Sequence, residues 1–164
     1  MSFALTVYTL VHVAISLVAI AAGIVVVAQL LAGKLPKRWT MFFLATTVAT
    51  SVTGFGFPFE RFLPSHGFGV LSLVALAIAI YALYARHLVG AWRWVYVIGA
   101  VVALYFNIFV LVVQLFLKVP ALKALAPTQS EPPFAITQLA VLVLFGILGV
   151  LAVIRFRPAV AGSS

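Results

Sequence analysis

Few side chains in this sequence are chemically equipped to bind a ligand or a metal ion, and most of them interrupt long apolar stretches. Two are histidines, His12 and His66, whose imidazole rings can donate a hydrogen bond, accept one or ligate a metal. The other candidates are amide and hydroxyl side chains in similar surroundings, namely Thr50, Ser51, Asn107, Gln114 and Gln138. These residue types favour binding of a small polar or amphipathic ligand, because none of them is a strong nucleophile without an activating base.

The elements that must position these side chains are five apolar stretches joined by short polar connections. They cover approximately residues 5–31, 40–57, 67–85, 95–117 and 135–154. Each approaches the ~20 residues that a helix needs to cross a hydrocarbon core about 30 Å thick. A helix satisfies its backbone hydrogen bonds internally, as lipid requires. The pattern predicts an all-α integral membrane protein with five transmembrane helices in one bundle.

Composition agrees with this class and excludes an ordinary soluble fold. Hydrophobic residues make up 66% of the 164 residues, charged residues 7%, and the mean hydropathy is +1.30. A typical soluble domain is about 45–50% apolar and about 25% charged. The connections leave no room for a second domain, so we expect one membrane domain over residues 1–158 and a flexible tail over residues 159–164.

The basic residues predict how the bundle is oriented. The connections assigned to one side hold Lys34, Lys37, Arg38, Arg86, Arg93, Arg155 and Arg157, and those on the other side hold Arg61, Lys118 and Lys123. The richer side should be cytoplasmic, which puts the N-terminus outside and the C-terminus in the cytoplasm. The formal charge of +8 is then explained by topology and by anionic lipid, and we expect no nucleic-acid partner.

The candidate residues are predicted to lie at similar depths in the bilayer. About twenty residues back from Lys34 along the first helix lies His12, close to the outer surface, and His66 opens the third helix at the same surface. The fourth helix carries Gln114 about one turn inside that surface. We therefore expect an outward-facing polar pocket built from the candidate residues named above. A lid of loop side chains should cover it, made of Glu60, Arg61, Gln129 and Glu131.

The connection between the fourth and fifth stretches has a character of its own. Residues 118–126 suggest a short surface helix, and the prolines that follow suggest a rigid, extended turn. Such a turn can cover a pocket or simply join two helices.

The same polar residues allow other interpretations. Hydroxyl and amide side chains also hold membrane helices together without binding anything, which would suit an accessory subunit of a larger complex. His12 and His66 could instead be the axial ligands of a b-type haem iron in an electron-transfer subunit. A zinc or similar metal site using both histidines and a carboxylate is a further possibility, which spacing alone does not support. His87 lies at the opposite edge, which limits the chain to one haem at most.

Catalysis is not indicated. The chain has no cysteine, no nucleophile elbow and no glycine-rich phosphate loop, and no Asp, Glu, Lys or Arg lies inside a predicted span. We therefore expect that the protein is not an enzyme by itself.

Three segments carry a resemblance to other sequences. Residues 53–59 (Thr-Gly-Phe-Gly-Phe-Pro-Phe), 64–66 (Pro-Ser-His) and 126–134 (Ala-Pro-Thr-Gln-Ser-Glu-Pro-Pro-Phe) resemble segments of small uncharacterised multi-pass proteins of the bacterial inner membrane. The resemblance implies that location but no function. The expectation for function is binding, sensing or passage of a small ligand, with membrane lipids and either protein partners or a second copy of the chain as neighbours.

Overall fold

The computed structural model describes residues 3–57 and 64–157, and all regular structure in these two ranges is helical. The elements are α1 (Phe3–Leu31), α2 (Lys37–Gly54), α3 (Pro64–Ile80), the π-helix η1 (Tyr81–Ala85), α4 (Trp92–Lys118), α5 (Pro120–Leu125) and α6 (Pro132–Arg155). The expected all-α fold is confirmed. The predicted short helix after residue 118 is also present as α5, and the two prolines at 132 and 133 open α6, where a missing N–H costs nothing.

Four segments are long and apolar enough to cross a membrane: Phe3–Leu31, Gly67–Ala85, Trp92–Lys118 and Pro132–Arg155. Among the described residues α2 does not join them, although the sequence predicts a span at residues 40–57. The reason is compositional, because α2 starts with Lys37 and Arg38 and then carries a run of threonines. The structure therefore supports four spans by length and composition, and the fifth stays a prediction.

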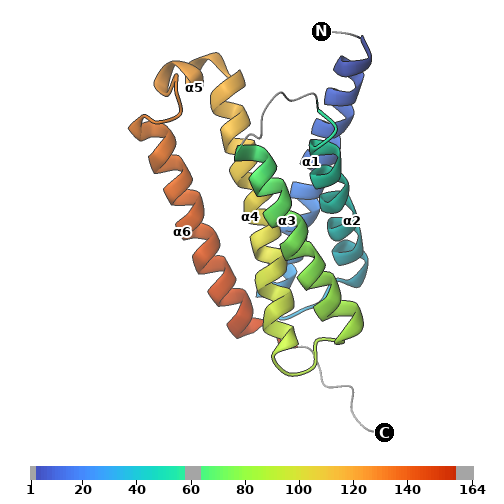
Figure 1. The fold of residues 1–164 in the computed structure, drawn as a ribbon. Helices are drawn as coiled ribbons and strands as arrows, with labels where there is room; N and C mark the ends of the chain where they lie inside the picture. The colour runs from blue at the N-terminus through green and yellow to red at the C-terminus, as the bar shows by residue number, and fades with distance from the viewer. Residues whose placement is uncertain (1–2, 58–63, 158–164) are drawn as a thin grey trace, which may run out of the picture.

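Consecutive long helices run in opposite directions through the bundle (Figure 1). The α1–α2 turn, the turn between η1 and α4, and the end of α6 lie together at one end of the molecule. The start of α1, the end of α2 and the short helix α5 lie at the other end. We call the first the basic end, since it carries Lys34, Lys37, Arg38, Arg86, Arg93, Arg155 and Arg157, and the second the His12 end.

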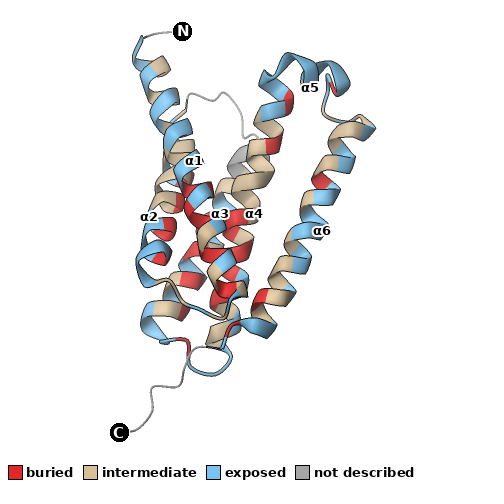
Figure 2. Ribbon diagram, turned by 180° about the vertical axis from the view of Figure 1, so that it is seen from behind, coloured by how far each residue is buried: buried red, intermediate tan, exposed pale blue. Residues whose placement is uncertain are grey.

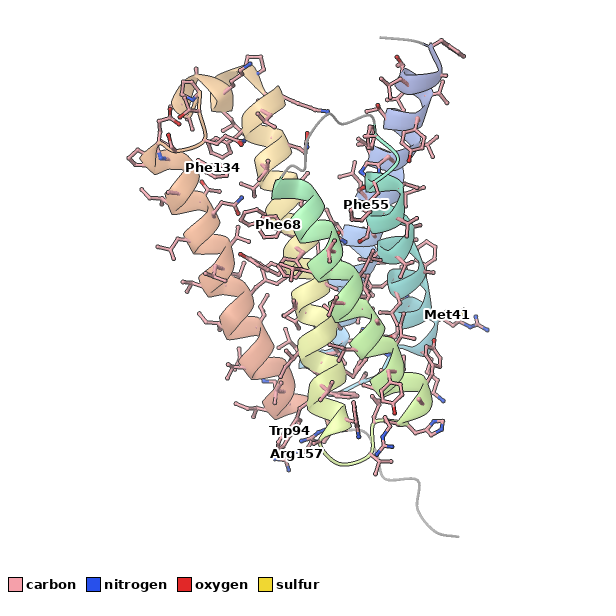
Figure 3. The ribbon with its side chains drawn as sticks, in the orientation of Figure 1. Met41, Phe55, Phe68, Trp94, Phe134 and Arg157 are labelled. Atoms are coloured by element: carbon pink, nitrogen blue, oxygen red, sulfur yellow. The ribbon has the colours of Figure 1, made fainter. Side chains whose placement is uncertain are left out.

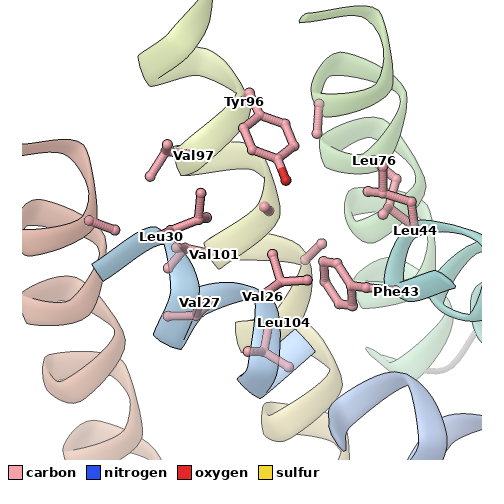
Figure 4. Close-up of a cluster of buried hydrophobic side chains, with 14 of the residues drawn as sticks. Val26, Val27, Leu30, Phe43, Leu44, Leu76, Tyr96, Val97, Val101 and Leu104 are labelled. Carbon is pink, nitrogen blue, oxygen red and sulfur yellow. The ribbon is translucent and has the colours of Figure 1, made fainter. Parts of the chain in front are cut away.

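The main core lies in the half of the bundle nearer the basic end, between α1, α2, α3 and α4 (Figure 4). Val26 and Leu30 of α1 and Phe43 of α2 are fully buried there. Gly23 permits the close approach of α1, because a Cβ at this position would stand 2.7 Å from Leu104 Cδ1 and 2.7 Å from Phe43 Cε2. Small residues at such crossings are the usual means by which membrane helices pack.

A second, smaller core ties the α4–α6 hairpin together. Val112 and Phe116 of α4 are buried with Ala126, which follows α5, and the ring of Phe134 in α6 meets Phe116 edge to face at 5.4 Å. Many residues of α6 are nevertheless exposed and are drawn pale blue along the ribbon of that helix (Figure 2). Its outward residues are large and apolar: Ile136, Leu139, Val143, Ile147, Val150 and Ile154.

Candidate functional site

Tyr8 and His12 of α1 meet the end of α2 near the His12 end. His12 Nδ1 lies 2.8 Å from Thr53 Oγ1, and the Tyr8 hydroxyl donates to the Thr53 carbonyl oxygen at 2.6 Å. Phe57 covers both rings edge to face, with centroids 4.9 Å from Tyr8 and 5.0 Å from His12. We call these four residues the α1–α2 polar cluster.

Hydrogen bonding in this cluster selects one tautomer of His12. The Thr53 hydroxyl has a single proton, which it donates to the Ala49 carbonyl at 2.7 Å, in the way that helical threonines commonly do. Its oxygen is then left to accept, so His12 Nδ1 must be the donor. In the neutral ring, Nε2 therefore carries a lone pair, and no hydrogen bond to Nε2 arises from the described residues. A histidine held through Nδ1 is the arrangement that aims Nε2 at a ligand or a metal.

Glycine next to the cluster is required for space. A Cβ at Gly56 would collide with the Tyr8 hydroxyl, so no larger residue fits while Tyr8 keeps its bond to Thr53. The turn that ends α2 is thereby pressed against α1. This explains the glycine at position 56, two residues after the end of α2.

Two further polar contacts join the helices of the main bundle. Ser51 of α2 donates to Ser72 of α3 at 3.3 Å, and Asn107 of α4 donates to Thr47 of α2 at 3.5 Å. Both are interhelical contacts of the kind that stabilises membrane bundles modestly. Thr50 differs, because its buried hydroxyl oxygen has no hydrogen-bond partner among the described residues.

The remaining amides belong to the α4–α6 hairpin. Gln138 donates from Nε2 to the Phe109 carbonyl at 3.2 Å, while its buried Oε1 has no partner in the described part of the chain. Gln114 is half-buried on α4. Above the main core, α1 and α6 stand on opposite sides of the bundle (Figures 1 and 2), so the structure does not bring Gln138 next to His12.

Two of the predicted lid residues, Gln129 and Glu131, are held in place by hydrogen bonds. Gln129 adopts a left-handed backbone (φ 60°) and donates from Nε2 to the Val113 carbonyl at 2.9 Å. Glu131 accepts hydrogen bonds from the Thr128 hydroxyl and from the amides of Thr128 and Ser130. Partial desolvation raises the pKa of Glu131, but these hydrogen bonds outweigh it and hold the pKa below its ordinary value. Glu60, Arg61 and the side chain of His66 lie outside the described residues.

Several partners were not singled out by the sequence interpretation. Tyr8 precedes His12 by one helical turn, so the i, i+4 spacing was the signal that both share a face. Thr53 and Ser72 belong to the small-residue faces of α2 and α3, but their specific partners follow only from how the helices cross. As for metals, the described residues contain no group of three or more His, Cys, Asp or Glu side chains that could hold an ion.

Surface hollows at the opposite end were also not predicted. One of about 490 Å³ is lined by Arg93 and Trp94 of α4 and by Arg157 beyond α6, and Figure 3 shows Trp94 and Arg157 side by side at the basic end. A second of about 360 Å³ lies between the start of α2 and the turn after η1.

The described part of the chain is all-helical and holds four helices that are long and apolar enough to span a membrane, which suggests a membrane protein. Its sequence matches no protein-family model, no curated protein and no solved structure.

Proposed function

We propose that the chain is a five-span protein of the bacterial inner membrane, with its N-terminus outside and its C-terminus in the cytoplasm. The position of α2, antiparallel to α1 and packed between α1 and α3, supports its assignment as the fifth span. The gathering of basic residues at one end supports the orientation, since lysine and arginine in short loops favour the cytoplasmic side.

Reporter fusions test this topology directly. A fluorescent protein fused after Ser164 should fold and fluoresce, while alkaline phosphatase at the same site should be inactive. Phosphatase inserted after Thr128, in the α5–α6 turn, should be active. The reverse pattern would overturn the orientation, and location of both sites on the same side would overturn the assignment of α6 as a span.

We propose further that the protein binds, senses or passes a small polar or amphipathic ligand that enters from the His12 end, and that it is not an enzyme by itself. The observation that carries this proposal is His12, whose ring is fixed through Nδ1 by Thr53 while Nε2 has no hydrogen-bond partner among the described residues. The unpartnered hydroxyl of Thr50 and the half-buried amide of Gln114 supply further groups able to bind such a ligand. Ser51, Asn107 and Gln138 belong to the same predicted site, although the first two bond to neighbouring helices and Gln138 does not lie next to His12.

The test is a comparison of small molecules retained by matched variants. Protein purified from its native membrane in mild detergent is extracted and the extract is analysed by mass spectrometry, for the wild type, His12→Ala, Gln114→Ala and the control Ser16→Ala. Ser16 lies one turn from His12, and its hydroxyl only donates to the His12 carbonyl. A compound enriched with wild type and control but lost from His12→Ala supports the proposal. Equal retention by all four proteins would sink it.

A second candidate function is an accessory subunit of a larger membrane complex. The apolar outward face of α6 favours it, because that helix packs on α4 and α1 along one side only. Extraction in mild detergent should then recover a partner chain in constant stoichiometry, and leucine-to-serine changes on that face should release it. Recovery as a free chain or as a homo-oligomer would count against this role.

A b-type haem with His12 and His66 as iron ligands is the third candidate. The free Nε2 of His12 supports it, whereas His66 contributes only its backbone position at the start of α3. An optical spectrum of protein expressed with added haem is the test. A Soret band that sharpens on reduction and disappears in His12→Ala would support the haem, and a featureless spectrum would remove it.

A further inference from the structure

The 360 Å³ cavity at the basic end has a lining that is half apolar and half polar. Leu35, Leu83 and Leu88 form its apolar part. Lys37, Tyr84 and His87 are exposed at its edge, and the buried Thr40 hydroxyl contributes at its floor, where it is paired with the Tyr96 hydroxyl at 3.1 Å. The volume falls within the range of small-molecule sites, about 300–1,000 Å³.

The backbone around this cavity is irregular in two ways. Helix α3 continues as the π-helix η1, whose Tyr81 carbonyl accepts from the amide of Arg86 at 3.0 Å, and such widened turns frequently occur at functional sites. The chain then reverses through His87 and Leu88, which hold positive φ angles of 48° and 59°. A left-handed conformation costs a residue with a side chain about 1–2 kcal/mol, so packing must maintain it. Leu88 is buried, and this conformation brings His87 to the edge of the cavity.

The charge around the cavity selects the sign of the ligand. Lys37 lines it, and the other basic residues named above belong to the same end of the bundle. The sequence contains two acidic side chains, Glu60 and Glu131; Glu131 precedes α6 at the His12 end, and Glu60 lies outside the described residues. Within the described residues no acidic side chain offsets the charge of Lys37 at the cavity, so an anion is favoured.

The position of the cavity at the end of the helices indicates which kind of anion it binds. It lies at the end of the spanning helices, where exposed Trp39, Tyr81 and Tyr84 form the aromatic boundary that is typical of the headgroup layer. Basic pockets between helices at this level suit phospholipid headgroups, with acyl chains running along the neighbouring apolar surface. The leucine side chains of the lining would make no favourable contact with a free inorganic anion.

We propose that this cavity is a binding site for an anionic glycerophospholipid, whose phosphate lies between Lys37 and His87 and accepts a hydrogen bond from Tyr84. The site goes beyond the ligand binding proposed for the His12 end and is independent of it. Because the groups are fixed by α2, η1 and the strained turn, binding depends on these positions as well as on overall charge.

Native mass spectrometry with paired variants tests the site. The protein in mild detergent is mixed with equal amounts of phosphatidylglycerol and phosphatidylcholine, and the retained lipids are counted. Wild-type protein should retain phosphatidylglycerol about tenfold better, a preference equivalent to about 1.4 kcal/mol. The double variant Lys37→Gln with His87→Gln should reduce this ratio to about one.

The control is Lys34→Gln with Arg38→Gln, which removes two charges from the same end but from residues that do not line the cavity. It should keep most of the preference. Equal loss in both double variants would overturn the site and leave only a general attraction of the basic end. Displacement of the lipid by millimolar inorganic phosphate would also overturn it, since the occupant would then be a free anion.

A second variant keeps the test independent of charge. Tyr84→Phe removes one hydroxyl from an exposed side chain and should weaken phosphatidylglycerol retention a few-fold with no change in thermal stability. Unchanged retention would remove Tyr84 from the site and contradict the proposed geometry.

Discussion

Two glycines, Gly23 in α1 and Gly146 in α6, illustrate how differently two equally apolar helices are used. Gly23 lies against Leu104 and Phe43 so closely that a Cβ would meet both side chains at 2.7 Å. A Cβ on Gly146 would meet nothing within 4 Å in the described structure. Helix α1 is built into the core, whereas α6 contacts the bundle along one side and presents large apolar residues outward. Hydrophobicity alone therefore does not indicate burial in this class of protein, since lipid is as apolar as a core.

The largest expected effect on stability comes from a substitution at Gly23, the closely packed glycine of this pair. Gly23→Leu should lower the free energy of unfolding by about 3 kcal/mol or more, because the added atoms force α1 away from α2 and α4. Gly146→Leu is the matched control and should change it by less than about 1 kcal/mol. Tryptophan emission during detergent-driven unfolding measures both. Equal destabilisation would mean that α6 is as closely packed as α1.

A smaller effect is expected from the buried hydroxyl pair of α2 and α4. Tyr96→Phe leaves the Thr40 hydroxyl buried without its partner and should cost about 1–2 kcal/mol. The double variant Tyr96→Phe with Thr40→Val removes both hydroxyls and should cost clearly less than the sum of the single changes. Strict additivity in this double-mutant cycle would show that the two groups do not interact.

In the α4–α6 hairpin we expect a weaker response to loss of a polar group. Gln138→Leu removes one hydrogen bond to the Phe109 carbonyl, but it also removes a buried oxygen that has no partner among the described residues. The two changes oppose each other, so the free energy of unfolding should shift by less than about 1 kcal/mol. A loss well above that, in the same unfolding assay, would indicate that a water molecule or a ligand satisfies Oε1.

The smallest expected effect is a pH dependence in the α5–α6 turn. Since folding lowers the pKa of Glu131, its contribution is fully present above the ordinary pKa of a glutamate and is lost as the pH falls through the lowered value. Amide exchange at Thr128 and Ser130, corrected for the intrinsic pH effect, should therefore accelerate in acid. Glu131→Gln should show fast exchange at every pH. No difference between the variant and the wild type would remove the carboxylate from the turn.

Much of the candidate site was open to prediction because its residue types are rare in membrane segments. His12, Asn107, Gln114 and Gln138 stand out by polarity alone. Their partners could not be predicted, since the contact of His12 with Thr53 depends on how α1 crosses α2, and that angle is set by small residues distributed along both helices. The separation of Gln138 from His12 has the same origin.

The backbone conformation of the segment from Tyr81 to Leu88 could not be predicted from the sequence. The sequence predicts helix up to residue 85, which is correct, but nothing in Tyr-Ala-Leu-Tyr-Ala predicts the widened π turn, because these residues suit an α-helix equally well. The left-handed conformation of Leu88 is also not encoded locally, since leucine rarely adopts positive φ, whereas histidine, as at His87, does so more often than most residues.

The sequence by itself determined the class of this protein: a sustained apolar composition leaves the backbone no choice but long helices, and the clustered lysines and arginines mark one end of the bundle. The tertiary structure alone decided which apolar faces are buried, which nitrogen of His12 is free, and where the basic end opens into a cavity. The physical reason is that hydrophobic patterning distinguishes membrane from water, while burial between helices depends on side-chain shapes that meet across the bundle.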